Sequence, residues 1–196
     1  MASQTLRDLN GFDSTPAALA DSTLILVDYQ NTYTHGVMEL DGWEPALTAA
    51  ADLLARARAA GAKVIHIIND GGVGTPYDIT AEIGRIHPAV APLEGEPVVV
   101  KTAPNAFVDT DLADHVDAAG NKSVVIAGFM THMCVTFTTE GAFLRGNLPT
   151  VVATACATRP LSSPAAEVPA AQLHNAALAT IGDLFGIVVA TPADLA

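Results

Sequence analysis

Short apolar runs rich in β-branched residues recur along the chain and constrain its fold more than any other feature. They occupy residues 23–29, 62–70, 97–101, 122–129, 150–158 and 186–190. The runs are continuously apolar rather than alternating, which is typical of strands buried on both faces of a parallel sheet. Segments with helical spacing separate them, such as 44–60 and 108–120, and a glycine closes each of these two. This alternation predicts a three-layer α/β/α fold around a doubly wound sheet of about six parallel strands.

The length and composition indicate one globular domain. The chain has 196 residues, of which 50% are hydrophobic and 15% are charged, a balance that supports a packed core and argues against disorder. Because no repeat or flexible linker divides the chain, we assign residues 1–196 to a single domain and residues 1–22 to an N-terminal arm. The longest irregular region, 69–96, is expected to line or cover a site.

The charge and the lack of targeting signals narrow the functional classes. A formal net charge of −12 would repel phosphate backbones, so a nucleic-acid partner is not expected. No apolar run approaches the roughly 20 residues of a membrane span, and the N-terminus does not resemble a signal peptide. We therefore expect a cytoplasmic protein with no membrane partner and with free thiols. No G-x-G-x-x-G follows the first strand, which argues against a dinucleotide cofactor.

Chemically active side chains follow three of the predicted strands. Asp28 ends the first strand, Lys101 ends the third, and the fourth leads into Cys134. Ligands of an open parallel sheet bind beyond the carboxyl ends of its strands, so these side chains are expected to converge. Each also has an ordinary structural interpretation, as a turn-forming aspartate, a solvated lysine and a buried apolar thiol. Their common placement at one edge favours a shared site over three unrelated roles.

Cys134 is the candidate nucleophile. A helix is predicted to begin at this residue, so the helix dipole and a nearby Lys101 ammonium are expected to favour the thiolate. Asp28 would be the general base that takes the thiol proton, and Lys101 the cation that balances the charge. His132 is an alternative base. Cys156 has no charged residue near it in the sequence and is interpreted as an inert buried thiol.

Three blocks of sequence resemble, in order, those of the isochorismatase-like cysteine hydrolases, the superfamily that includes nicotinamidase and N-carbamoylsarcosine amidohydrolase. LILVDYQNTY carries Asp28 at the position of the catalytic aspartate, and VVVKTAPNAF carries Lys101 at that of the catalytic lysine. VVIAGFMTHMCVTFTTEGAFLRG carries Cys134 at the position of the nucleophile. Each block alone is moderately specific, but the three in this order form a strong signature. The resemblance spans residues 22–190 and implies a Rossmann-like isochorismatase fold.

The resemblance implies a cysteine-dependent amidohydrolase that forms a thioester on a small amide or lactam and releases ammonia or an amine. It also implies a cis peptide bond between Phe129 and Met130, and an oxyanion hole formed by the backbone N–H groups of Met130 and Cys134. Two other functions stay open. One is hydrolysis of an ether or ester by the same residues, and the other is a catalytically idle binding protein on the same fold.

The sequence departs from the pattern of nicotinamidases, which hold a metal with an aspartate and paired histidines after the second strand. Here that position reads NDGGVG, and His87 lies far along the loop. We therefore predict no metal and no other cofactor, and we interpret Asp70 and Asp78 as loop caps. The motifs THMC and ACATR resemble an amidohydrolase branch that includes streptothricin hydrolase, although Thr154 stands where many relatives carry aspartate.

The remaining candidates are expected to line a pocket for a small-molecule amide. They are polar, aromatic or sulfur-containing residues near the predicted strand ends, namely Gln30, Tyr33, Trp43, Tyr77, Phe107, His132 and Met133. A neutral or cationic substrate is expected to enter this acidic protein more easily than a polyanion. The resemblance also implies a homo-oligomer, a dimer or tetramer, in which a predicted helix over 162–182 would pack against a partner copy.

Overall fold

A six-stranded sheet forms the centre of the molecule in the computed structural model, which describes residues 3–195. The strand order is β3-β2-β1-β4-β5-β8. The strands are β1 (Ser22–Val27), β2 (Lys63–Asn69), β3 (Val98–Lys101), β4 (Ser123–Gly128), β5 (Leu148–Val152) and β8 (Ile187–Val189). Every neighbouring pair is parallel, so the predicted doubly wound fold is confirmed.

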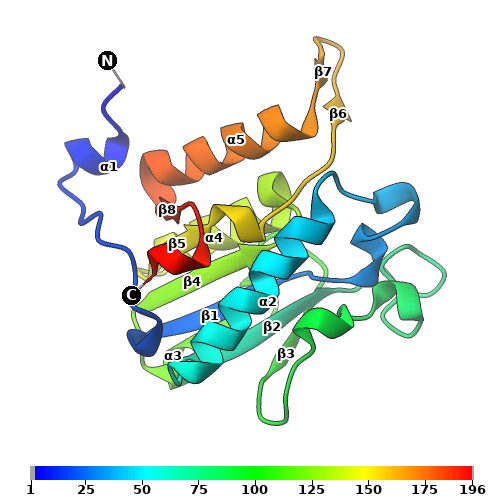
Figure 1. The fold of residues 1–196 in the computed structure, drawn as a ribbon, viewed down its shortest axis with the longest axis horizontal. Helices are drawn as coiled ribbons and strands as arrows, with labels where there is room; N and C mark the ends of the chain where they lie inside the picture. The colour runs from blue at the N-terminus through cyan, green and yellow to red at the C-terminus, as the bar shows by residue number, and fades with distance from the viewer. Residues whose placement is uncertain (1–2, 196) are drawn as a thin grey trace.

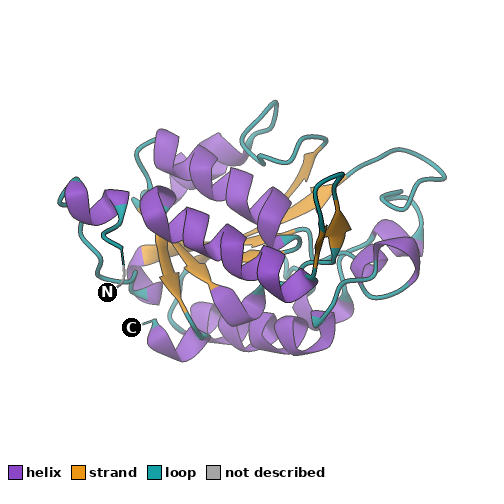
Figure 2. Ribbon diagram, turned by 90° about the horizontal axis from the view of Figure 1, so that it is seen from above, coloured by secondary structure: helices purple, strands orange, loops and turns teal. Residues whose placement is uncertain are grey.

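Helices cover both faces of the sheet (Figures 1 and 2). α2 (Trp43–Ala59) lies on one face, and α3 (Leu112–Ala119) and α4 (Thr136–Leu144) lie on the other. This division follows from the strand order, because right-handed crossovers that run in opposite directions along a sheet place their helices on opposite faces. β1, at the centre, is buried along all six of its residues. Among the described residues, none of the helices is long and apolar enough to cross a membrane.

The helix predicted over 162–182 is shorter in the structure. α5 spans Ala170–Thr180, and the residues before it form an antiparallel hairpin of β6 (Leu161–Ser162) and β7 (Glu167–Val168). Pro164 and Pro169 explain the difference, because proline lacks an N–H and disfavours helical backbone in the preceding residue. The hairpin projects from the body of the molecule in Figure 1. The prediction of a helix over its residues was therefore wrong.

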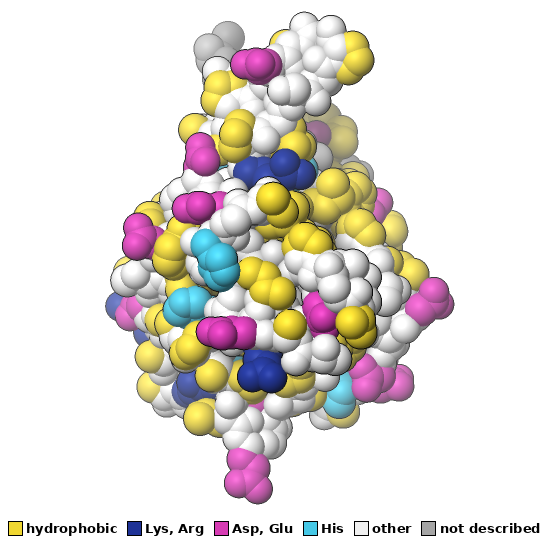
Figure 3. All heavy atoms as spheres, turned by 90° about the vertical axis from the view of Figure 1, so that its right-hand side faces the viewer, with side chains coloured by type: hydrophobic (Ala, Val, Ile, Leu, Met, Phe, Trp, Pro, Cys, Tyr) yellow, Lys and Arg dark blue, Asp and Glu magenta, His cyan; other side chains and the backbone are white. Residues whose placement is uncertain are grey.

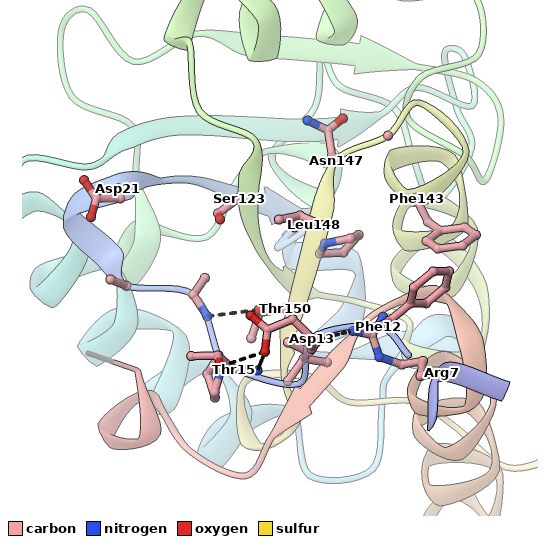
Figure 4. Close-up of a pocket in the computed structure, with 16 residues that line it drawn as sticks. Arg7, Phe12, Asp13, Thr15, Asp21, Ser123, Phe143, Asn147, Leu148 and Thr150 are labelled. Carbon is pink, nitrogen blue, oxygen red and sulfur yellow. Dashed lines mark hydrogen bonds between the residues drawn. The ribbon is translucent and has the colours of Figure 1, made fainter. Parts of the chain in front are cut away.

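The N-terminal arm packs at the amino ends of the strands, away from the edge where ligands are expected. Its short helix α1 (Leu6–Leu9) is held by a hydrogen bond of 3.0 Å from the Leu6 N–H to the Asp183 carboxylate. A cavity of about 470 Å³ lies between the arm and the sheet, lined by Phe12, Phe143 and Leu148 among others (Figure 4). Because Leu148 is the first residue of β5, this cavity is separate from the carboxyl edge.

An ionic cluster fixes the end of the long loop to the sheet. The Glu96 carboxylate accepts hydrogen bonds of 2.8 and 2.7 Å from Arg58 on α2 and lies 3.0 Å from Nε2 of His66 on β2. It also accepts the Leu93 N–H at 2.9 Å. The bonds from Arg58 lower the pKa of Glu96 to about 2, although burial acts in the opposite direction. Burial lowers the pKa of His66, so this imidazole is neutral near pH 7.

Replacing Glu96 with glutamine should lower the free energy of unfolding at pH 7. The pKa falls from 4.5 to about 2 in a side chain that is 13% exposed, which corresponds to about 3 kcal/mol. A carboxylate whose pKa is lowered stabilises the fold above its unfolded value, and that stabilisation is lost as the pH falls toward 2. The difference between wild type and Glu96→Gln in urea titrations should therefore shrink below pH 4.5.

Asp52→Asn is the matched control for this measurement. Asp52 pairs with Arg56 on the surface, where the two side chains are 53% and 48% exposed. An exposed pair of this kind contributes about 0.5 kcal/mol or less. Equal losses in both variants, or a Glu96→Gln effect that does not change with pH, would show that the buried cluster does not stabilise the loop.

Candidate active site

The end of β1 places Asp28 at the carboxyl edge of the sheet. The residue directly follows the strand and has a left-handed backbone conformation, with φ of 53°, which aspartate tolerates better than most non-glycine residues. Its N–H donates to the Ile67 carbonyl at 3.1 Å, and its own carbonyl accepts the Gln30 N–H at 2.8 Å. These bonds fix the turn, and the carboxylate is held fully buried at the strand end.

Lys101, the last residue of β3, reaches across β2 to Asp28. Its Nζ lies 2.7 Å from Asp28 Oδ2, 3.0 Å from Asn69 Oδ1 and 3.4 Å from Cys134 Sγ. The Lys101 and Asp28 side chains are both 0% exposed. The structure thus brings together the three side chains that the strand-end pattern placed at one edge, and adds Asn69 to them.

Cys134 lies in a π-helical turn, Thr131–Val135, that leads directly into α4. Burial of the thiol and the nearby Asp28 carboxylate raise its pKa to about 12, although Lys101 acts in the opposite direction. The expectation that the helix dipole and Lys101 would favour a resting thiolate is therefore wrong. Desolvation and the neighbouring Asp28 charge outweigh the Lys101 ammonium, so the free site holds a protonated thiol.

Asp28 is suited to accept the thiol proton. Burial raises the pKa of its carboxyl, and Lys101 opposes that change. Burial lowers the pKa of Lys101, but the charges of Asp28 and Cys134 outweigh it, so the net shift is upward. Oδ2 of Asp28 lies 2.7 Å from the Lys101 ammonium, whereas Oδ1 has no hydrogen-bond partner among the described residues. A buried carboxylate with a raised pKa and free lone pairs is a good proton acceptor.

The backbone before the thiol leaves the Met130 N–H without a partner among the described residues. The peptide bond between Phe129 and Met130 is cis. The chain around it is held by bonds from the Phe129 N–H to Val27 O, at 2.9 Å, and from the Thr131 N–H to Ala157 O, at 3.0 Å. Within residues 3–195, the Met130 N–H has no hydrogen-bond acceptor. Such a free donor is what an oxyanion contact requires.

Two of the predicted pocket residues, Tyr33 and Tyr77, lie beside the cluster. Their rings are in edge contact, with centroids 5.8 Å apart. Burial raises the pKa of both, and the charges of Asp28 and Cys134 act in the same direction. Both hydroxyls therefore stay protonated near the thiol. Tyr33 is fully buried against Tyr77, whereas the partly buried Tyr77 hydroxyl can donate a hydrogen bond to a ligand.

His132 has a hydrogen-bond partner away from the thiol. Its Nδ1 lies 2.5 Å from Thr158 Oγ1, and burial, with a contribution from Arg159, lowers its pKa. Among the hydrogen bonds and ion pairs of the described chain, none joins His132 to Cys134, whereas Lys101 contacts both Cys134 and Asp28. This geometry favours Asp28 over His132 as the base. Met133 packs, partly buried, at the edge of the core.

Gln30 organises the site rather than facing a ligand. Its Nε2 donates to the carbonyls of Asn69 and Gly84, at 2.9 and 2.7 Å, and its Oε1 accepts the Asn69 N–H at 2.9 Å. Both amide hydrogens and the amide oxygen are therefore satisfied by backbone. This geometry does not agree with the predicted contact between Gln30 and a substrate. Gln30 instead connects the end of β1 to β2 and to the long loop.

Two other pocket candidates have partners of their own. The Trp43 ring packs against His87, with centroids 6.4 Å apart. The Phe107 ring lies under the Arg145 guanidinium, 5.3 Å from its centroid. Each ring thus packs against another side chain of the protein, and a role of Trp43 and Phe107 in substrate binding stays a prediction.

The residues after β2 do not fit a metal site. Asp70 accepts the Gly72 N–H at 2.8 Å, and Asp78 accepts the N–H groups of Gly74 and Thr80 at 2.8 and 2.9 Å. Both carboxylates thus cap the loop, as predicted. Over the described range 3–195, no three His, Cys, Asp or Glu side chains are grouped as ligands for an ion.

Two residues at the site had no predicted role. Asn69 ends β2 and accepts a hydrogen bond from Lys101, and its position at a strand end was a usable signal. Arg159 follows Thr158, whose Oγ1 contacts His132 Nδ1, and its charge adds to the burial that lowers the pKa of His132. It is the last residue of the ACATR motif, so the resemblance to the amidohydrolase branch included it, although no role was assigned to it.

Comparison with known proteins identifies the family. Residues 22–193 match the family model of the isochorismatase domain. The chain belongs to the isochorismatase family. A crystal structure of an isochorismatase from Pseudomonas putida is similar over 100% of both chains, with a TM-score of 0.95 and 36% identity.

Relatives within the isochorismatase family include amidohydrolases. A maleamate amidohydrolase from Pseudomonas putida is 31% identical over 91% of this chain and 84% of its own. A streptothricin hydrolase from Streptomyces noursei is 36% identical over 84% of this chain and 67% of its own. A secreted isochorismatase effector from Verticillium dahliae is 32% identical over 95% and 97%. The chain is thus an isochorismatase-family hydrolase with amidohydrolases among its relatives.

Replacing Asp28 with asparagine should make Cys134 more reactive toward iodoacetamide at neutral pH. Asparagine keeps the side-chain shape and tolerates the left-handed backbone. Loss of the negative charge leaves Lys101 beside the sulfur and should lower the pKa of the thiol from about 12. Each unit of that fall raises the thiolate fraction about tenfold. Intact-mass measurement of alkylation, in a Cys156→Ala background, gives the rate.

Asp70→Asn is the control, because Asp70 carries the same charge but caps the loop. Alkylation of this variant should match the wild type. If Asp28→Asn were alkylated no faster than Asp70→Asn, the Asp28 carboxylate would not be what holds the thiol protonated.

Proposed function

We propose that this protein is a cysteine-dependent amidohydrolase that cleaves the carbon–nitrogen bond of a small amide or lactam through a thioester. The observation that carries the proposal is one buried ammonium, Lys101, in contact with both Asp28, at 2.7 Å, and Cys134, at 3.4 Å. This arrangement combines a nucleophile, a proton acceptor and a fixed positive charge.

The first step transfers one proton and forms one bond. Asp28 takes the proton of the thiol as Cys134 Sγ attacks the amide carbon, and the electron pair of the C=O bond moves onto oxygen. The N–H groups of Met130 and Cys134 would stabilise that oxyanion. Because the pKa of the free thiol is about 12, attack and proton transfer are coupled rather than sequential.

The later steps return the site to its starting state. The proton held by Asp28 passes to the leaving nitrogen, the C–N bond breaks, and ammonia or an amine departs. Asp28 then accepts a proton from a water molecule whose oxygen attacks the thioester. The C–S bond breaks, the acid leaves, and the sulfur regains its proton from Asp28. Lys101 pairs with the Asp28 carboxylate whenever it is ionised.

An amide is favoured over an ether or ester because of the proton that Asp28 holds after attack. Nitrogen leaves a tetrahedral intermediate readily only when it is protonated, so a neighbouring acid is required. The likeness to a maleamate amidohydrolase also supports cleavage of a C–N bond. An ether or ester hydrolase and a catalytically idle binding protein are the alternatives that the substrate test separates.

Tyr33, Tyr77, His132 and Met133 are the proposed contacts of the small-molecule substrate. A homo-oligomer and a cytoplasmic location stay predictions, which light scattering and cell fractionation measure. The Verticillium dahliae relative is named as a secreted effector, so location does not follow from membership of the family.

Replacing Cys134 with alanine or serine should lower the rate of ammonia release from a panel of small amides by at least about 10³-fold. The wild type, quenched in acid during turnover, should carry one acyl group by intact mass, and that adduct should be absent from Cys134→Ala. Cys156→Ala is the control and should keep its rate within about twofold, because Cys156 donates to a backbone carbonyl outside the site.

Other outcomes of this experiment would favour a different function. Turnover of amides by Cys134→Ala would remove the thioester mechanism. Hydrolysis of esters or vinyl ethers without any ammonia release would favour the first alternative. No turnover of either class by a folded wild type would favour the binding protein.

A further inference from the structure

Thr131, the first residue of the π-helical turn that carries the thiol, is held through all of its polar groups. Its side chain is buried. Its N–H and its hydroxyl both donate to Ala157 O, at 3.0 and 3.1 Å, and its carbonyl accepts the Thr136 hydroxyl at 2.7 Å. Its Oγ1 also lies 2.9 Å from Nδ1 of His174. Because Thr131 directly follows Met130, these bonds restrain the backbone of the proposed oxyanion donor.

His174 is the donor in its contact with Thr131. The Thr131 hydroxyl has a single proton, which it donates to Ala157 O, so its remaining lone pair can only accept. We therefore assign the proton of this contact to Nδ1 of His174. That N–H is present in the neutral tautomer and in the imidazolium alike, so the contact does not depend on the charge of the ring.

This contact joins α5 to the nucleophile. Within residues 3–195, no other hydrogen bond links α5 to the turn Thr131–Val135. The β6–β7 hairpin that leads into α5 stands clear of the body of the molecule (Figure 3), so the hairpin does not fix the start of the helix there. His174 also lines a cavity of about 480 Å³ together with Cys156 and Thr158. Close packing therefore does not hold the ring on that side, and the hydrogen bond to Thr131 sets its place.

We propose that His174 is a positioning residue that acts through Thr131 on the Met130 N–H. This inference rests on the proposed amidohydrolase function and adds a residue to its machinery. His174 holds the Thr131 hydroxyl, and the Thr131 backbone in turn directs the oxyanion donor. Such a donor is effective only when it is aimed at the place where the oxyanion forms. A displacement of about 1 Å can lower a rate by about 100-fold, so one hydrogen bond far from the substrate can control kcat.

Asparagine and glutamine at position 174 separate positioning from packing. The amide nitrogen of asparagine lies close to the place of the histidine Nδ1, whereas that of glutamine extends to the place of Nε2. His174→Asn should therefore still donate to Thr131 and keep kcat for ammonia release within about threefold. His174→Gln and His174→Leu should lower kcat by at least about tenfold with KM nearly unchanged. Equal kcat values in the Asn and Gln variants would overturn the proposal, even if His174→Leu does not fold.

His115→Leu is the matched control for the loss of a histidine. His115 lies on α3, is 37% exposed and pairs with Asp111 at 3.4 Å. This variant should keep both kcat and KM of the wild type. A loss of kcat in His115→Leu as large as that in His174→Leu would show that the measurement reports a general effect on the fold, and would count against the proposal.

A double-mutant cycle tests the route through Thr131. Thr131→Val removes the hydroxyl that His174 holds, and it should lower kcat by itself. If His174 acts only through that hydroxyl, the variant Thr131→Val/His174→Leu should lose no more than Thr131→Val alone. Losses that multiply would show that His174 acts independently of Thr131 and would overturn the proposed route.

The binding of butanal separates this inference from the proposed function, because it requires no amide turnover. The Cys134 thiol adds to the aldehyde: the S–C bond forms, the thiol proton ends on the carbonyl oxygen, and that oxygen would accept the Met130 N–H. NMR with butanal labelled with ¹³C at its carbonyl carbon measures the adduct, which should be absent from Cys134→Ala. The adduct should be at least about tenfold weaker in His174→Gln than in His174→Asn.

The two proposals then fail in different ways. A difference in butanal affinity between the Asn and Gln variants, without amide hydrolysis by the wild type, would refute the amidohydrolase and keep the positioning role of His174. Amide hydrolysis by the wild type, with equal butanal affinity in the two variants, would keep the amidohydrolase and refute the positioning role.

Discussion

The buried ion pair between Asp28 and Lys101 is the interaction on which the site depends. Both side chains are 0% exposed, and their charged atoms are 2.7 Å apart. Either charge alone would be strongly unfavourable away from water, so each residue requires the other. Parallel pairing sets their distance, because Asn69 pairs with Lys101 between β2 and β3, and Val27 pairs with Ile67 between β1 and β2. The sheet brings the two charges together, and they fix an ammonium beside the thiol.

Burial alone does not distinguish the two cysteines. It is the largest cause that raises the pKa of both Cys134 and Cys156 to about 12. The Cys156 thiol donates to the Val152 carbonyl at 3.4 Å, whereas Cys134 lies beside an ammonium and a carboxylate. Neither thiol is ionised at rest, but Cys134 has beside it the carboxylate that we propose as the base. The proposed mechanism therefore depends on a coupled proton transfer and not on a stored anion.

The sequence predicts the features of the site that follow from strand order. It misses those that depend on the distances between side chains. Continuous apolar runs mark the strands, and parallel order then places Asp28, Lys101 and the turn with Cys134 at one edge. The state of the thiol was predicted wrongly, because a helix dipole and one ammonium compete there with burial and one carboxylate, and only their separations decide the result. The segment before α5 was predicted as helix from its alanines, while Pro164 and Pro169 set its actual form.

Side-chain bonds to the backbone have no sequence pattern, yet they decide whether the site is formed before a ligand binds. Gln30 ties the end of β1 to β2 and to the long loop, and Asp78 caps that loop from within. These bonds hold Tyr77 against the cluster, so little ordering remains to be done on binding. Within this frame the Met130 N–H has no acceptor among the described residues. A donor fixed in this way stabilises charge on a ligand without reorganisation, which is the property that the proposed hydrolase needs at its oxyanion.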